Sequence, residues 1–203
     1  MGEKGLLCIQ TSRVTKSRMP SPIAHTAIGY LIFKVQRRGD VRKGQKWTRA
    51  VAPTLIVVLG LSILPDLDSV AGILMGDFGS YHNNWTHSLL IGLGVALVIG
   101  SLVWLMRHSG FGRWFIITLL CYELHVVMDY FTIGRGVMAF WPFSLERFAS
   151  PVPVFYGLRW SDGWLSTRHL FTITTEVGFI ILVVIIAHSN LIRKNLIRRF
   201  TRD

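Results

Sequence analysis

The chain is short of charged residues for its length, and this shortage limits the kind of protein it can be. Charged residues make up 16% of the 203 positions, whereas soluble domains carry about 25%. Hydrophobic residues reach 51%, and the mean hydropathy is +0.44. The composition therefore indicates a membrane protein, and the length predicts a single domain.

Several sequence signals are also missing. The two cysteines, Cys8 and Cys121, form no CxxC pair and no zinc-ribbon pattern, so neither a disulfide framework nor a cysteine metal site is expected. No GxSxG elbow supports a serine hydrolase. The net charge of +11 would suggest nucleic acid in a soluble protein, but the positive residues cluster outside the apolar segments. We therefore predict no nucleic-acid partner.

The first 18 residues are polar and basic and lack the apolar stretch of a signal peptide. We expect residues 1–18 to be a disordered basic extension, or sequence upstream of a true start at Met19. Residues 19–203 then form a single integral membrane domain.

Four apolar segments approach the roughly 20 residues that are needed to cross a bilayer. They are residues 51–65, 88–106, 114–131 and 171–187. A fifth, 21–33, is shorter and is either a tilted span or a helix packed at an angle. The sequence therefore predicts an all-α fold, a polytopic membrane helix bundle with four or five transmembrane helices.

The connections between these segments differ in positive charge. Residues 34–49 hold seven Lys or Arg, residues 67–87 hold none, and the tail after His188 holds five. Because positive loops stay in the cytoplasm, residues 34–49, 107–113 and the tail are predicted inside, where they would contact anionic lipid. Residues 66–87 and 132–170 are predicted on the outer side.

This threading gathers seven histidines and aspartates at the outer side. A carboxylate or an imidazole beside a membrane span is costly unless something compensates it. Where several such side chains converge, the usual compensation is a divalent metal. The seven residues are His25, Asp66, Asp68, His82, His87, His125 and Asp129.

The HVVMD motif places His125 and Asp129 on one face of a predicted helix, four residues apart. Together they could grip an ion; the alternative is a buried hydrogen bond between helices. His25 stands alone on an apolar segment, which is more typical of a core residue, and only its depth links it to the others.

The other two motifs lie near the predicted loop 66–87. In LPDLD, Asp66 and Asp68 follow Pro65 on a stretch predicted to be non-helical, so that only one of them needs to be a ligand. The alternative is an ordinary charged helix end. In HNNWTHS, His82 and His87 open the next span, and interfacial polar residues are the alternative.

Three further features accompany these motifs. Glu123 points away from His125 and could pair with an arginine or support the site from behind. Glu176 is either a supporting partner of the site or a helix-packing residue. The outer stretch 132–170 is rich in Trp, Phe, Pro and Arg, which is typical of an interfacial loop and also of a lid over the site.

Five sequence stretches together resemble one family. SPIAHTAIGYL, LPDLDS, HNNWTHSLL, HVVMDYFTIGRG and WPFS resemble the YdjM-like inner-membrane proteins, which are described as LexA-regulated, metal-dependent membrane hydrolases. The resemblance covers residues 19–145, and it implies that the seven residues above form the metal site. The family usually has an arginine where this chain has Asn83. The order of motifs is also distantly similar to the zinc-dependent phospholipase C and P1-nuclease group, without its later HxxxE element.

The predicted function is metal-dependent hydrolysis of a phosphoester or lipid-linked substrate at the outer face of a bacterial inner membrane. We predict a zinc ion, with manganese or iron as alternatives. Asp66 or His82 would act as general base or in a second ligand set. The alternatives are a non-catalytic protein with a structural metal and a transporter or ion pathway. The predicted metal ligands are His25, Asp68, His87, His125 and Asp129.

Overall fold

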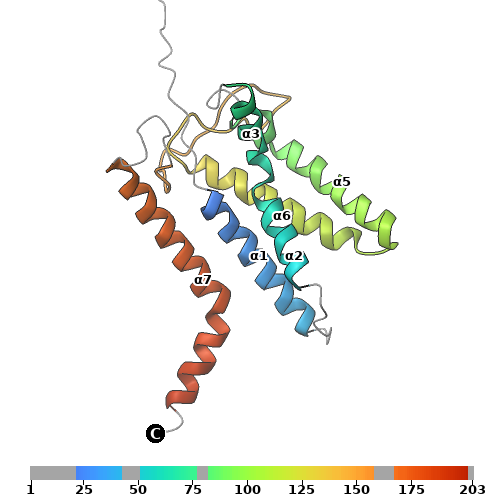
Figure 1. Ribbon diagram of the computed structural model, residues 1–203, viewed down its shortest axis with the longest axis vertical. Coiled ribbons are helices and arrows are strands. Elements are labelled where there is room, and N and C mark those ends of the chain that lie inside the picture. Colours follow the sequence, from blue (N-terminus) through green and yellow to red (C-terminus); the bar gives the residue numbers. More distant parts are fainter. Residues whose placement is uncertain (1–21, 43–50, 77–81, 158–166, 201–203) are drawn as a thin grey trace, which may run out of the picture.

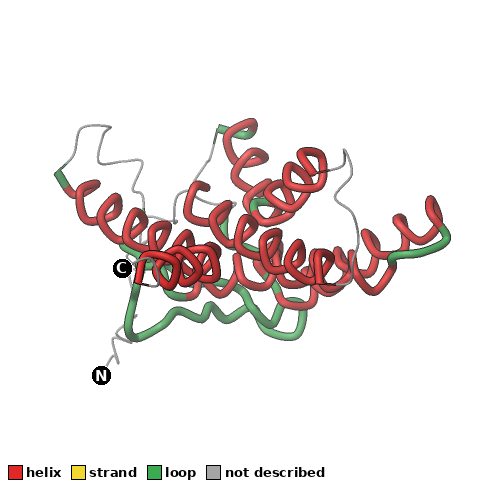
Figure 2. Tube along the Cα trace, turned by 90° about the horizontal axis from the view of Figure 1, so that it is seen from below, coloured by secondary structure: helices red, strands yellow, loops and turns green. Residues whose placement is uncertain are grey.

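The computed structural model describes residues 22–42, 51–76, 82–157 and 167–200; the predicted extension 1–18 lies outside them. Regular structure within these ranges is helical (Figures 1 and 2), with two isolated β-bridges. The all-α prediction is therefore confirmed. In chain order the elements are α1 (Pro22–Arg42), α2 (Val51–Ser62), the 3-10 turn η1 (Leu64–Asp66), α3 (Leu67–Leu74), the 3-10 turn η2 (Trp85–His87), α5 (Leu89–Arg107), α6 (Phe111–Tyr130) and α7 (Arg168–Phe200).

Three of these helices are long and apolar enough to cross a membrane: α5, α6 and the part of α7 from His169 to Ser189. A fourth crossing is possible if α2 and the segment Leu64–Leu74, which meet at a bend of 57°, count as one span. The predicted segment 21–33 falls largely within α1, which continues to Arg42 and packs against α2, α6 and α7.

The LPDLD stretch is helical, so the expectation of a non-helical segment was wrong. The helix of α2 stops at Ile63, whose φ of −111° and ψ of 2° leave the helical range, and Pro65 then occupies an early position of η1. A proline is tolerated there because the first amides of a helix have no internal partner. The helix therefore resumes at once in a new direction, with Asp66 at the bend.

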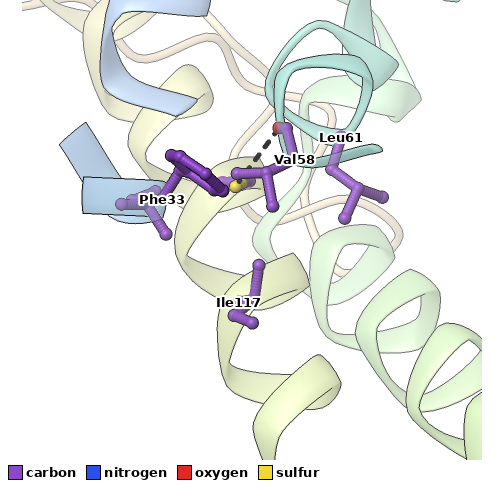
Figure 3. Packing of buried hydrophobic residues seen from close by; sticks show 6 residues of the cluster. Phe33, Val58, Leu61 and Ile117 are labelled. Carbon is purple, nitrogen blue, oxygen red and sulfur yellow. Dashed lines mark hydrogen bonds between the residues drawn. The ribbon is translucent and has the colours of Figure 1, made fainter. Parts of the chain in front are cut away.

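Helices α1, α2 and α6 share an apolar core. Phe33, Val58, Leu61 and Ile117 pack together with Cys121 (Figure 3). Cys121 is fully buried, and its sulfur lies 3.7 Å from the Val58 carbonyl oxygen. The cysteine is thus a small core residue, and it packs the middle of α6 against α2.

Helix α5 approaches α6 closely because it presents glycine at the contact. A Cβ atom at Gly92 would lie 2.7 Å from the Tyr122 ring, which is too close for any other residue. Tyr122 also donates a hydrogen bond of 2.5 Å to the Thr86 carbonyl, just before α5. This packing brings the start of α5 against the last turns of α6.

The loop after α6 folds back over the same end of the bundle (Figures 1 and 2). Its Phe155 is buried with Ala24 of α1 and Met128 of α6. The loop carbonyl of Ala139 accepts a hydrogen bond of 3.0 Å from the Leu89 amide at the start of α5. The loop therefore ties three helix ends together.

Candidate metal centre

All seven histidines and aspartates that the sequence singles out lie at this tied end of the bundle. They come from four places: His25 from α1, Asp66 and Asp68 from the bend before and within α3, His82 and His87 from the segment before α5, and His125 and Asp129 from the last turns of α6. The side chains of the four histidines and of Asp129 are 0% exposed. The α2–α3 bend and the loop after α6 are what bring these distant segments to one depth.

Four of the seven form a compact group of candidate ligands. Single atoms of Asp66, His87, His125 and Asp129 all lie within 4.8 Å of one another. The His87 Nε2 is 3.0 Å from Asp129 Oδ2, and the His125 Nε2 is 3.3 Å from Asp66 Oδ1. The two Nε2 atoms are 3.3 Å apart. Two imidazole nitrogens and two carboxylate oxygens thus converge on one small volume.

The far nitrogen of each of these two imidazoles is held in place. His125 Nδ1 lies 2.8 Å from the carbonyl oxygen of Ser62, the last residue of α2. A carbonyl only accepts, so Nδ1 carries the proton and Nε2 keeps its lone pair for an ion. His87 Nδ1 lies 3.3 Å from Asp68 Oδ2 and 3.0 Å from Thr86 Oγ1. Such outer contacts fix the ring orientation of metal-binding histidines.

Asp68 differs from the other two aspartates because its oxygens already have hydrogen-bond partners. Thr86 Oγ1 donates to Oδ2 at 2.6 Å and Ser69 Oγ donates to Oδ1 at 3.3 Å. His82 Nδ1 lies 3.1 Å from the same Oδ1. One carboxylate therefore orients both His82 and His87. Asp68 also belongs to a second group of candidate ligands, with those two histidines.

The residues fit a divalent cation because many of their buried oxygen and nitrogen atoms have no hydrogen-bond partner in the described part of the chain. Both oxygens of Asp66, both oxygens of Asp129, both nitrogens of His25 and the Nε2 of His82 are buried with no hydrogen-bond partner among the described residues. Buried polar atoms in that condition cost about 1–3 kcal/mol each. A cation bound between them would supply the missing partner and neutralise the carboxylates, and the nitrogen and oxygen set suits zinc.

The electrostatics of His87 agree with this assignment. Burial by itself lowers the pKa of His87, but the carboxylates of Asp129, Asp66 and Asp68 outweigh burial and raise that pKa well above its ordinary value. Without an ion the imidazole therefore attracts a proton to the same place. An ion that binds there must displace that proton.

His25 flanks the group from α1. Its Nε2 lies 3.4 Å from Asp129 Oδ1, and its ring stacks on that of His125 with centroids 3.7 Å apart. His82 approaches from the other side, with its Nε2 4.0 Å from Asp129 Oδ2. Asp129 is thus surrounded by imidazoles.

Two arginines of the loop after α6 support the site, and neither of them was predicted from the sequence. Arg135 donates to the carbonyl of His82. Arg147 donates to the carbonyl of Asn83 at 2.8 Å and to the side chain of Asn84. Asn83 has a φ of +58°, a left-handed conformation that asparagine adopts more readily than most residues, and the two arginines contact the turn that carries His82. The sequence signal for them was the presence of basic residues in the aromatic stretch 132–170.

The two glutamates of the apolar helices, half-buried Glu123 and buried Glu176, do not belong to either ligand group. The Glu123 carboxylate lies against Gly92 of α5, and its oxygens have no hydrogen-bond partner among the described residues. Of the two alternatives for Glu123, a pairing with an arginine is therefore not found in the part of the chain that the structure describes. Glu176 is buried on α7 with 7% of its surface exposed.

Comparison with known families identifies the group to which this fold and this cluster belong. The family model described as YdjM inner membrane protein matches residues 19–197. The chain belongs to the YdjM family. The match confirms the resemblance seen in the motifs and extends it beyond Leu145 through most of α7. Together with the apolar helices, membership makes the chain an integral membrane protein. No curated protein and no solved structure matches the chain.

Proposed function

We propose that this YdjM-family protein is a membrane-bound, metal-dependent hydrolase that acts on a phosphoester or lipid-linked substrate at the outer face of the inner membrane. The observation that carries the proposal is the convergence of Asp66, His87, His125 and Asp129 on one volume. The carboxylate oxygens in this group are buried without hydrogen-bond partners among the described residues. An arrangement of that kind is costly to fold unless the carboxylates are neutralised, either by protons on the facing imidazoles or by a bound cation that displaces those protons.

The geometry suggests a role for each residue. His87 and His125 would hold the ion through Nε2, and Asp129 would hold it from the last turn of α6. A divalent ion bound there supplies a water of lowered pKa and polarises the scissile oxygen. The Oδ1 of Asp66 lies 3.3 Å from His125 Nε2, and neither of its oxygens has a hydrogen-bond partner among the described residues, so it is suited both to bind the ion and to accept a proton from that water. Asp68 would orient His87 and His82.

The direction of α6 supports an outer location for the site. Arg113 lies in the first turn of α6 and Asp129 in its last, and 16 residues at 1.5 Å each separate them by about 24 Å. The basic turn between α5 and α6 therefore lies near one membrane face and the histidines and aspartates near the other. Since positive loops stay in the cytoplasm, the site would face the periplasm.

Two alternatives are less well supported. A structural zinc site has four ligands and no open position, whereas here seven candidate residues surround the centre. An ion pathway needs polar groups along its length, yet α5 has no ionisable residue between Leu89 and Met106. We therefore favour hydrolysis.

Metal analysis of detergent-purified protein tests the proposal. We expect about one divalent ion per wild-type chain and a near-complete loss in Asp129→Ala and His125→Ala. His108→Ala is the matched control, because His108 is exposed at the α5–α6 turn and should leave the metal content unchanged. Equal metal in all four proteins would refute the site. Metal binding without hydrolysis of any phospholipid or soluble phosphodiester offered would leave only a structural role.

A further inference from the structure

Among the residues that the structure describes, the centre is closed on almost every side, and Asp66 is the most exposed of the seven side chains. Of the seven side chains, Asp66 is 13% exposed and Asp68 6%, and the other five are 0% exposed. The turn that carries His82 is held down by Arg135 and Arg147. In the part of the chain that the structure describes, the approach to the centre is therefore beside Asp66.

The surface beside Asp66 is apolar. Helix α3 turns Asp68, Ser69 and Gly72 inward. Its exposed residues are all apolar: Leu67, Val70, Ala71, Ile73 and Leu74. An outward face with no polar side chain suits the hydrocarbon of a membrane and not water.

One row of this face leads directly to the centre. Asp66, Val70 and Leu74 are spaced four apart, which places them along one side of the helix. Val70 is 49% exposed and Leu74 is 83% exposed. The segment Leu64–Leu74 follows α2 in the chain, and the two together are long and apolar enough to cross the membrane if the bent pair is one span. An apolar chain in the membrane can therefore lie along α3 while a polar group attached to it meets Asp66.

A bent span with a carboxylate at its bend is itself typical of a binding site. Inside a membrane, irregular backbone is tolerated only where it is buried in protein or lines a polar cavity. The chain bends by 57° at Ile63, and Asp66 follows directly. The bend thus brings the polar centre next to the lipid-facing row.

We propose that α3 is a docking surface for the acyl chain of a membrane phospholipid, which reaches Asp66 sideways from the bilayer with its phosphoester toward the centre. This inference rests on the proposed function for the fate of the phosphoester, but the docking itself does not require hydrolysis. The docking surface consists of Val70 and Leu74, and the acyl chain of a phospholipid packs against them.

The test measures retention of a lipid separately from turnover. Purified protein is mixed with phosphatidylglycerol and examined by native mass spectrometry under conditions that strip loosely bound lipid. We expect one retained lipid on the wild type and also on Asp129→Asn, whose ligand set is impaired. The double variant Val70→Ser, Leu74→Asn should lose at least tenfold in retention while its metal content stays at the wild-type level.

The chain supplies a matched control. Val98 and Leu102 on α5 are the same residue types at the same spacing, and they are 58% and 48% exposed. The double variant Val98→Ser, Leu102→Asn should keep the lipid. No retained lipid on the wild type, or equal loss in both double variants, would overturn the inference. A lipid retained through α3 but never hydrolysed would uphold the docking surface and refute the proposed function.

Discussion

Replacing Asp68 by asparagine separates a residue that orients the ligands from a residue that binds the ion. Asparagine keeps the size of the side chain, and its single oxygen can still accept the hydrogen bond from Thr86 that Asp68 receives at 2.6 Å. It cannot supply the negative charge that faces His82 Nδ1 at 3.1 Å and His87 Nδ1 at 3.3 Å. The two imidazoles would remain near the centre, but with less basic Nε2 atoms and a weaker preference for one ring orientation.

The expected size of the effect follows from that position. Loss of an outer partner of a metal-binding histidine typically lowers metal affinity by 10–100-fold, which is about 1.4–2.7 kcal/mol. Asp68 contacts two histidines, so we expect the upper half of this range. Asp129→Asn changes a residue of the convergent group itself and should abolish binding at micromolar zinc.

Competition with a chromophoric zinc chelator measures both variants against the wild type. Asp68→Asn should still bind one ion, with its dissociation constant raised, and Asp68→Glu should bind no better, because the longer side chain moves the carboxylate away from Ser69 and Thr86. If Asp68→Asn loses the ion as completely as Asp129→Asn, Asp68 is a ligand and the second group, with His82 and His87, is occupied. If its affinity is unchanged, Asp68 has no orienting role.

Three further outcomes are expected. Zinc affinity should fall as the pH is lowered. The carboxylates raise the pKa of His87, so that below this raised pKa a proton competes with the ion for the imidazole. A zinc affinity that does not change with pH in the chelator assay would refute this. Arg147→Ala should weaken zinc binding several-fold, because it removes the contacts of Arg147 with the turn 82–84. Arg147→Lys should not restore binding, because a lysine lacks the planar fork with which arginine reaches two acceptors. Full zinc binding by either variant would show that these contacts do not support the site. Gly92→Leu should destabilise the α5–α6 contact by about 1–3 kcal/mol and lower the midpoint of thermal unfolding in detergent. Gly94→Leu is the control, because a Cβ atom there meets nothing within 4 Å, and it should not lower the midpoint. Equal midpoints for the two variants would show that α5 and α6 are not closely packed at Gly92.

The helical elements were predictable because each long apolar run has to satisfy its backbone internally, and a helix does so within one segment. The runs 88–106 and 114–131 correspond to α5 and α6 within a few residues. The stretch after Pro65 was not predictable in the same way. A proline usually ends a helix, and Pro65 was therefore expected to end the apolar helix before it. At an early position of a new helical turn a proline costs no hydrogen bond, so the chain continues as η1 and α3.

For the candidate site, the sequence was enough to predict which residues take part but not the role of each one. The residue types and their positions at the ends of apolar runs indicated a metal site and named all seven side chains that the structure brings together. The assignment of roles depends on which oxygens are already hydrogen-bonded, and that information lies in Ser69, Thr86 and the Ser62 carbonyl. A backbone carbonyl has no signature in a sequence, and serine and threonine are too common to stand out.

The bend after α2 explains why two aspartates in one short motif take different environments. Had LPDLD been an extended loop, Asp66 and Asp68 would point the same way, since residues two apart on a strand share a face. On a helix, where each residue turns the chain by about 100°, two residues that are two apart diverge by roughly 200°. Asp68 therefore turns inward to Thr86 and the backs of two imidazoles, while Asp66 stays at the edge of the centre beside the exposed row of α3. A change that straightens the bend should disturb both roles together, whereas Asp68→Asn should disturb only one.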